Sequence, residues 1–87
     1  MQQFADEITR QLLPTIREAS TDDRTYVKKA VSWALRQIGK RSPGLNAKAI
    51  RTAEQIGRID ARASRWVARD ALRELRSDAV QERLTRR

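Results

Sequence analysis

The segment VKKAVSWALRQIGKR, from Val27 to Arg41, constrains the fold of this chain more than any other stretch. At about 100° of rotation per residue, one side of this segment is apolar, with Leu35 at the edge of the stripe. The apolar positions are Val27, Ala30, Val31, Ala34 and Ile38. A helix with one apolar stripe buries that stripe against other elements. We therefore expect a helix that packs on its neighbours along one face.

The opposite side of the same helix alternates aromatic and cationic side chains. Tyr26, Lys29, Trp33, Arg36 and Lys40 are spaced 3, 4, 3 and 4 residues apart, which stacks them along one line. Cations that grip phosphates beside a ring that stacks on a base or sugar are typical of nucleic-acid binding. The alternative is that both rings pack under a neighbouring helix and the cations form a solvated face.

Charge favours a polyanionic partner. The chain has 19 Lys and Arg against 11 Asp and Glu, a net charge of +8 and a pI near 11.3. Up to Asp23 there are only two basic and five acidic residues, so the remainder carries +11. A basic body behind an acidic first helix indicates binding to nucleic acid, although ribosome-associated and membrane-surface proteins share such a charge.

Composition narrows the chemistry and the compartment. Among the 87 residues there is no cysteine and no histidine, which argues against disulfides, a zinc site and the usual general base near neutral pH. We expect no metal site. The amphipathic N-terminus does not resemble a signal sequence, and no apolar run reaches membrane-spanning length, so we expect a soluble cytoplasmic protein without membrane contact.

Helical patterns run along almost the whole chain, and no strand pattern appears. Pro14 should kink or divide the first helix near Arg10 to Leu13. Asp22 is the expected N-cap of the second helix, which the run Ser42-Pro43-Gly44 should break after Lys40. Asn46 is the expected cap of a third helix that ends at Gly57, a fourth starts between Asp60 and Ser64, and Ser77 is the expected cap of a short last one. The fold class is therefore all-α.

An internal repeat organises these helices. Ala34-Leu35-Arg36-Gln37-Ile38 recurs as Ala71-Leu72-Arg73-Glu74-Leu75, 37 residues later. A helix pair that recurs at this spacing predicts an α-solenoid fragment of HEAT-like helix pairs, with four main helices and a short C-terminal helix. We expect one module over residues 1–87, with repeat 1 at about 3–41, repeat 2 at about 46–76 and the terminal helix at about 78–85.

The second helix of each pair carries cations, which predicts two basic ridges on one surface. The first ridge is the line that includes Lys29, Arg36 and Lys40. The second consists of Arg62, Arg65, Arg69, Arg73 and Arg76. Two parallel cationic ridges match the backbone of duplex DNA better than a point ligand.

Two tracts, DDRTYVKKAVSWALRQIGKRSPGLNAKAI and SRWVARDALRELRS, resemble the C-terminal part of bacterial DNA alkylation repair proteins. That family comprises the HEAT-like alkylpurine DNA glycosylases, and the resemblance runs from about Phe4 to Leu84. It implies binding of double-stranded, lesion-containing DNA in a basic groove and hydrolysis of the N-glycosidic bond of N-alkylated purines without a cofactor. It also implies that Trp33 faces the lesion and that Arg36 lies on the DNA-facing side.

The chain departs from the family in length and in its catalytic group. Family members are roughly two and a half times longer, and their catalytic aspartate comes from helices upstream of anything present here. No acid in this chain aligns with it: Asp22 and Asp23 are explained by helix capping, and Asp70 by an intrahelical salt bridge. We therefore expect a DNA-binding segment that contributes to base excision repair with little or no catalysis of its own.

Other readings stay open at this stage. The chain can be a non-catalytic scaffold or homodimer that pairs through an exposed N-terminal end of the solenoid at Phe4, Ile8 and Leu12. It can also be an RNA-binding or ribosome-associated protein. A helix-turn-helix regulator is disfavoured by a connection expected to run from Lys40 to Asn46. Trp66 is either a second DNA contact or, more in keeping with its surroundings, packed on the last helix.

Overall fold

A computed structural model describes residues 2–86, and every regular element in this range is helical. The elements are α1 (Gln2–Glu7), the π-helix η1 (Ile8–Leu12), α2 (Leu13–Ala19), α3 (Thr25–Gly39), α4 (Pro43–Gly57), α5 (Arg62–Leu75) and α6 (Asp78–Thr85). The expected all-α class is confirmed. None of these helices combines the length and apolarity needed to cross a membrane.

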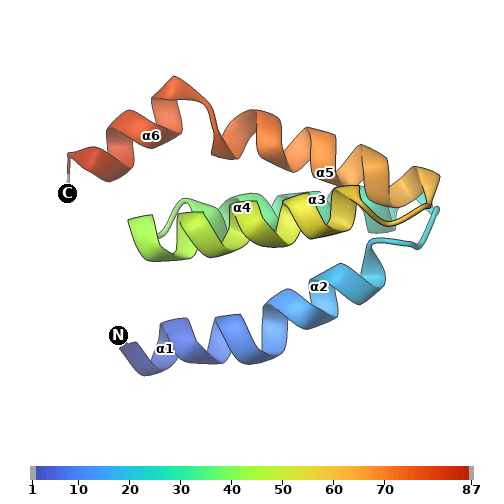
Figure 1. Cartoon of the computed structure of the whole chain (residues 1–87), viewed down its shortest axis with the longest axis horizontal. Coiled ribbons are helices and arrows are strands. Elements are labelled where there is room, and N and C mark those ends of the chain that lie inside the picture. The colour runs from blue at the N-terminus through green and yellow to red at the C-terminus, as the bar shows by residue number, and fades with distance from the viewer. Residues whose placement is uncertain (1, 87) are drawn as a thin grey trace.

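The first helix is interrupted where the proline predicts it. Pro14 has no backbone N–H and lies in the first turn of α2. Directly before it, the backbone N–H of Leu13 bonds to the carbonyl of Ile8, five residues back, and Ile8–Leu12 forms a π-helix. The chain therefore absorbs the proline by widening one turn, and α1, η1 and α2 form a single bent rod (Figure 1).

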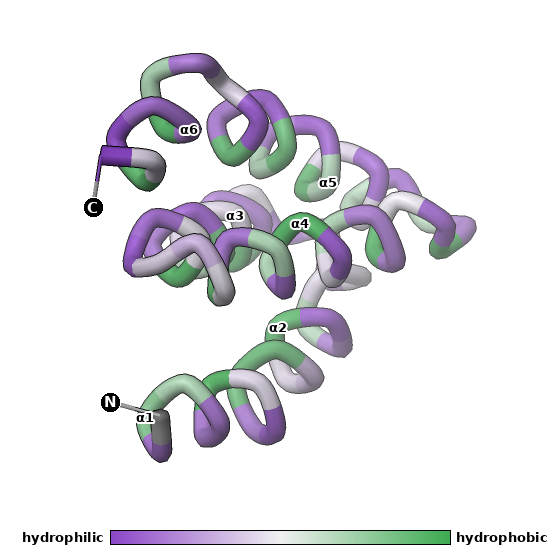
Figure 2. The backbone as a smooth tube through the Cα atoms, turned by 60° about the vertical axis from the view of Figure 1, so that its left-hand side comes forward, coloured by the Kyte–Doolittle hydropathy of each residue, from purple (hydrophilic) through white to green (hydrophobic). Residues whose placement is uncertain are grey.

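The helices form two antiparallel pairs, the α1–α2 rod with α3 and α4 with α5. The α1–α2 rod and α4 run in one direction, whereas α3 and α5 run back in the other (Figure 1). The apolar sides of α3, α4 and α5 meet one another, and α2 packs against α3 and α4 (Figure 2). The fully buried centre comprises Leu35, Ala49, Ala53, Ile56, Val67, Ala71 and Leu75.

Contacts between the two pairs recur at one sequence separation. Side-chain hydrogen bonds join Arg17 to Gln55, Ser32 to Asp70 and Arg36 to Glu74, each 38 residues apart. The Lys28 ammonium lies over the Trp66 ring, 5.5 Å from its centroid, at the same separation. A constant separation means that the second pair stacks on the first by translation along the chain. This arrangement agrees with the 37-residue repeat in the sequence and gives an all-α helical-repeat fold.

The buried stripe of α3 lies further round the helix than its sequence predicts. Leu35, expected at the edge, is fully buried, and Ala30, expected inside, is exposed. The reason is that α3 packs against α2, α4 and α5, so its buried arc extends toward α5. Sequence periodicity locates an apolar stripe but does not reveal polar residues that a third neighbour covers, such as Ser32, which is 0% exposed.

Two of the expected helix caps are wrong, and the third is confirmed. Arg24, not Asp22, is the N-cap of α3, while Asp22 accepts the backbone N–H of Arg24 in the preceding turn. Ser42 caps α4 by accepting the backbone N–H of Leu45. Ser77 caps α6 as expected, by accepting the N–H of Val80.

The run Ser42-Pro43-Gly44 follows the end of α3, as expected, and also starts α4. A proline at the first helical position loses no helical hydrogen bond, because the first N–H groups have no partner in any helix. Asn46 is instead buried inside α4 and donates to the carbonyl of Gly39. The connection between α3 and α4 is only Lys40 to Ser42, so its expected length, which was the argument against a helix-turn-helix, is wrong. The two helices nonetheless lie antiparallel and side by side (Figure 1).

The N-terminal rod is only partly uncovered. Phe4 and Leu12 are 46% and 50% exposed, as expected, whereas Ile8 is buried. The Arg41 guanidinium lies over the Phe4 ring at 4.7 Å from its centroid, which ties the rod to the end of α3.

Gly39 allows the end of α3 to approach α4 and α5. A Cβ at this position would overlap the side chain of Leu75 and lie 3.2 Å from Cβ of Ala49. We expect Gly39→Ala to lower the free energy of unfolding by about 1–3 kcal/mol, as overpacked cores do. Thermal unfolding should then show a Tm roughly 4–8 °C lower per kcal/mol. Gly44→Ala is the matched control, because nothing lies within 4 Å of its added Cβ. Equal Tm values for the two variants would contradict this packing.

Candidate nucleic-acid interface

The outward side of α3 presents the two rings that its sequence predicts. Trp33 is 58% exposed and Tyr26 is 68% exposed, so neither packs under a neighbouring helix. Lys29, one turn before Trp33, is exposed and has no ion-pair partner among residues 2–86. Tyr26 is less free than Trp33, because Arg24 donates to its hydroxyl at 2.9 Å and lies over its ring. Arg24 is itself paired with Asp22, and its hydrogen bonds lower the pKa of that carboxyl to about 2. Trp33 and Lys29 are therefore the members of the predicted line that are exposed and make no side-chain contact with a charged group among residues 2–86.

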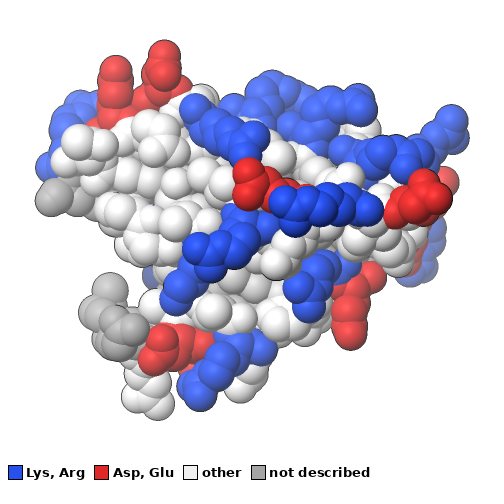
Figure 3. Space-filling model, viewed as in Figure 1, with Lys and Arg blue, Asp and Glu red and all other residues white. Residues whose placement is uncertain are grey.

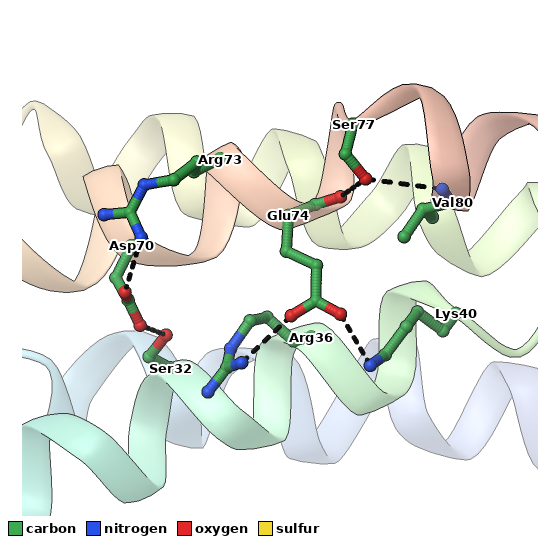
Figure 4. Close-up of polar contacts among 8 residues, drawn as sticks. All are labelled: Ser32, Arg36, Lys40, Asp70, Arg73, Glu74, Ser77 and Val80. Carbon is green, nitrogen blue, oxygen red and sulfur yellow. Dashed lines mark hydrogen bonds and ion pairs between the residues drawn. The ribbon is translucent and has the colours of Figure 1, made fainter.

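Arg36 and Lys40 are not free cations. Both donate to one carboxylate, that of Glu74 on α5, at 2.9 Å from Arg36 Nη1 and 2.7 Å from Lys40 Nζ. Figure 4 shows Glu74 reaching down from α5 between the two cations of α3. Their side chains are 28% and 20% exposed, against the expected fully exposed row. The reason is that the parallel α5 places the carboxylate of Glu74 between these two cations.

The electrostatics of this contact favour the charged carboxylate. Hydrogen bonds from Lys40 and then from Arg36 hold the pKa of Glu74 below its ordinary value of 4.5. Glu74 also lies in the last turn of α5, at the negative end of the helix dipole, where a carboxylate without cations is disfavoured. In addition, Nε of Arg36 is buried with no hydrogen-bond partner. Both carboxylate oxygens of Glu74 therefore accept from cations, whereas one N–H group of Arg36 is left without an acceptor.

Asp70 is held in the same way, one turn earlier. Its carboxylate accepts the Ser32 hydroxyl at 2.5 Å and pairs with Arg73 at 3.3 Å (Figure 4). The expected intrahelical salt bridge is confirmed. Both of its oxygens are engaged, so a structural role explains this acid.

The arginines of α5 form one exposed line, as their 3, 4, 4 and 3 spacing predicts. Three of them have acidic partners: Arg65 pairs with Asp60, Arg73 with Asp70 and Arg76 with Glu54. Arg62 and Arg69 have none within the described part of the chain. Blue side chains gather along the upper edge of the molecule over α5, next to red ones (Figure 3).

Sequence reasoning missed Glu74 and the contact of Asp70 with α3, both of which lie between the two ridges. Asp70 and Glu74 form a row that faces α3, bounded on one side by Arg36 and Lys40 and on the other by Arg73. The 37-residue repeat carried the necessary signal, because it sets residues of the two helices side by side at this separation. The interface is thus a basic row, an acidic row and a second basic row, with Trp33 at its margin.

Trp66 packs against the core, as the favoured reading predicts, and is half-buried. The group over its ring is Lys28 of α3, however, and not the last helix. No group of three or more acidic residues within residues 2–86 lies close enough together to hold a metal ion.

The comparisons agree with the resemblance of the sequence. The family model described as DNA alkylation repair enzyme matches residues 2–75, and the chain belongs to this family. No curated protein and no solved structure matches it.

Glu74 makes stability depend on pH. Because its pKa is lower in the folded state than in the unfolded chain, it stabilises the fold above 4.5, and this contribution is lost as the pH falls below that value. We expect Glu74→Gln to lower Tm at pH 7 and to reduce the fall in Tm between pH 5 and pH 3. Thermal unfolding followed by circular dichroism at several pH values measures both effects. Glu82→Gln, on the exposed surface of α6, is the control and should leave the profile unchanged. A wild-type profile for Glu74→Gln would exclude the contact.

Proposed function

We propose that this member of the DNA alkylation repair family binds the backbone of duplex DNA with the outward surface of α3 and α5. The observation that carries the proposal is Trp33, a large ring 58% exposed on the same helix face as an unpaired lysine. A stacking ring beside a cation binds a base or sugar together with its phosphate. We take DNA as the nucleic acid because the chain belongs to the DNA alkylation repair family.

The contacts that we propose fall into two groups. Lys29, Arg62 and Arg69 have no acidic partner among residues 2–86 and meet phosphates directly. The cations already paired with acids contribute less, since a phosphate has to compete with a carboxylate for them; these are Arg36, Lys40, Arg65 and Arg73. Arg36 has a reason to move, because turning outward exposes the buried Nε that now lacks a partner. Tyr26 lies at the start of the α3 line that contains Lys29 and Trp33, and in the proposed complex it packs beside the DNA backbone.

The resemblance leads us to propose a lesion-bearing duplex as the preferred target and an N-alkylated purine as the lesion. Such a base is cationic, and an aromatic ring favours it by cation–π contact worth about 0.5–2 kcal/mol. Trp33 is placed to supply this ring. The acids on this surface, Asp70 and Glu74, are committed to ion pairs, so we propose binding without glycosidic hydrolysis by this chain. We further propose that the two stacked pairs are HEAT-type repeats and that the protein acts at the nucleoid in the cytoplasm.

A second function rests on a separate observation. Phe4 and Leu12 expose apolar surface on the N-terminal rod, which favours self-association or docking on another chain. This scaffold reading predicts association that is insensitive to salt and requires no DNA.

Salt dependence tests the phosphate contacts. We expect fluorescence anisotropy of a labelled duplex to give a linear fall of log K with log salt concentration. Lys29→Ala and Arg69→Ala should each lower the slope by about 0.9 if each side chain meets one phosphate. Arg83→Ala, an exposed cation on α6, is the control. Unchanged slopes would remove α3 and α5 from the interface, and salt-insensitive self-association without DNA affinity would favour the scaffold.

Trp33→Ala separates a contact role from a packing role. We expect duplex affinity to fall by roughly 1–3 kcal/mol, the range for loss of one base–aromatic stack, with little change in Tm because the ring is largely exposed. Quenching of Trp fluorescence on DNA binding should also diminish. Trp66→Ala is the opposite case, since its ring packs against the core, and should lower Tm. A large loss of stability in Trp33→Ala with normal affinity would contradict the proposal.

A further inference from the structure

A hollow of about 160 Å³ lies between the N-terminal rod and α4. From the rod, Thr9, Leu13, Pro14 and Arg17 line it. From α4, it is lined by Lys48, Arg51, Thr52 and Gln55, which at spacings of 3, 1 and 3 share one side of that helix. Its position is distinct from the α3–α5 surface, because none of its lining residues belongs to α3 or α5, and the rod lies below α4 whereas α5 lies above it in the view of Figure 1.

The lining of this hollow is cationic and contains no acid. Arg17, Lys48 and Arg51 contribute three positive charges. Neither Lys48 nor Arg51 has an ion-pair partner among residues 2–86, and Arg17 donates only to the amide oxygen of Gln55, at 2.9 Å. The nearby acid of α4, Glu54, is paired with Arg76, and Glu18 does not line the hollow. Unpaired cations around a concave surface focus a positive potential into it.

Two uncharged polar groups of the hollow can donate to a ligand. Thr52 is only 8% exposed, and its hydroxyl makes no hydrogen bond to the described part of the chain. This hydroxyl is not sealed off from solvent, so it can donate to an acceptor that enters the hollow. Because the oxygen of Gln55 accepts from Arg17, its NH₂ group remains available to donate. Together with the three cations, these groups call for a ligand with several negatively charged oxygens.

Size restricts the ligand further. Pockets for drug-sized molecules have volumes of about 300–1,000 Å³. At about 160 Å³, the hollow accepts a single small anion or one protruding group, and not a whole nucleotide. We propose that it is a phosphate-binding site for one phosphate group, carried by free phosphate or by a polynucleotide backbone. This proposal does not depend on DNA binding by α3 and α5.

Titration with inorganic phosphate tests the site. With ¹⁵N-labelled protein, we expect saturable shifts of the backbone amides around Thr52 and Gln55. Lys48→Gln together with Arg51→Gln should weaken phosphate binding about tenfold or more. Arg62→Gln together with Arg69→Gln removes the same charge from α5 and should change it less than about twofold. Absence of saturation in the wild type, or equal weakening by both double variants, would overturn the proposal.

Thr52→Val tests the hydroxyl separately from charge. It keeps the shape of the side chain and removes a group that has no protein partner, so Tm without phosphate should stay the same or rise. Phosphate affinity should nevertheless fall by about threefold or more. Unchanged affinity would contradict the role that we assign to this residue.

A duplex titration identifies the source of the phosphate. If the backbone occupies the hollow, the Lys48/Arg51 double variant binds duplex DNA more weakly and inorganic phosphate competes with the duplex for the wild type. If the ligand is free phosphate, this variant binds the duplex as tightly as the wild type does but binds inorganic phosphate more weakly. A chain that binds phosphate but no duplex would reject the proposed function and keep this site.

Discussion

The packing of α3 beside α5 depends on one interaction, the contact of the Glu74 carboxylate with Arg36 and Lys40. Helices α3 and α5 run parallel, and each carries a row of cations along the side that it presents to solvent. Two such rows at the distance of packed helices repel each other unless acids lie between them. Glu74 and Asp70 are those acids. Glu74 accepts from Arg36 of α3 and from Lys40 directly after it, and Asp70 accepts from Ser32 of α3 and from Arg73 of α5. The two basic helices can therefore pack side by side.

This arrangement limits the field that the surface offers to DNA. The net charge of +8 overstates the attraction at its centre, because Glu74 and Asp70 neutralise part of it there. Among residues 2–86, the cations of this surface that have no acidic partner are Lys29 of α3 and Arg62 and Arg69 of α5. In the proposed complex, these cations hold the DNA backbone more strongly than the paired ones do. A stacking residue such as Trp33 then contributes a larger share of the affinity, and this share is little affected by salt.

Much of this fold follows from local sequence rules. Pro14, the position of Ser77 and the 37-residue repeat predicted the bent first helix, the last cap and the stacking of two pairs. The rules failed at Asp22, whose carboxylate is held by Arg24 two residues away, and at Asn46 and the Leu35 stripe, where contacts distant in sequence decide. Asn46 is polar enough to cap a helix, but Gly39 and Leu75 supply buried carbonyls to its amide. The site shows the same division: the exposure of Trp33 was predictable, whereas the pairing of Arg36 with Glu74 required two helices to be placed together.

Where the surplus charge is located also bears on stability. On the α3–α5 surface, Asp70 and Glu74 offset part of the cationic charge. In the hollow between the rod and α4, three cations line one surface that has no carboxylate in its lining. Their mutual repulsion lowers stability when the hollow is empty. A phosphate that binds only the folded state relieves this repulsion and stabilises the fold by RT ln(1 + [L]/Kd). The π-turn before Pro14 forms one wall of this hollow through Thr9 and Leu13, so phosphate binding also stabilises the bend that the proline creates.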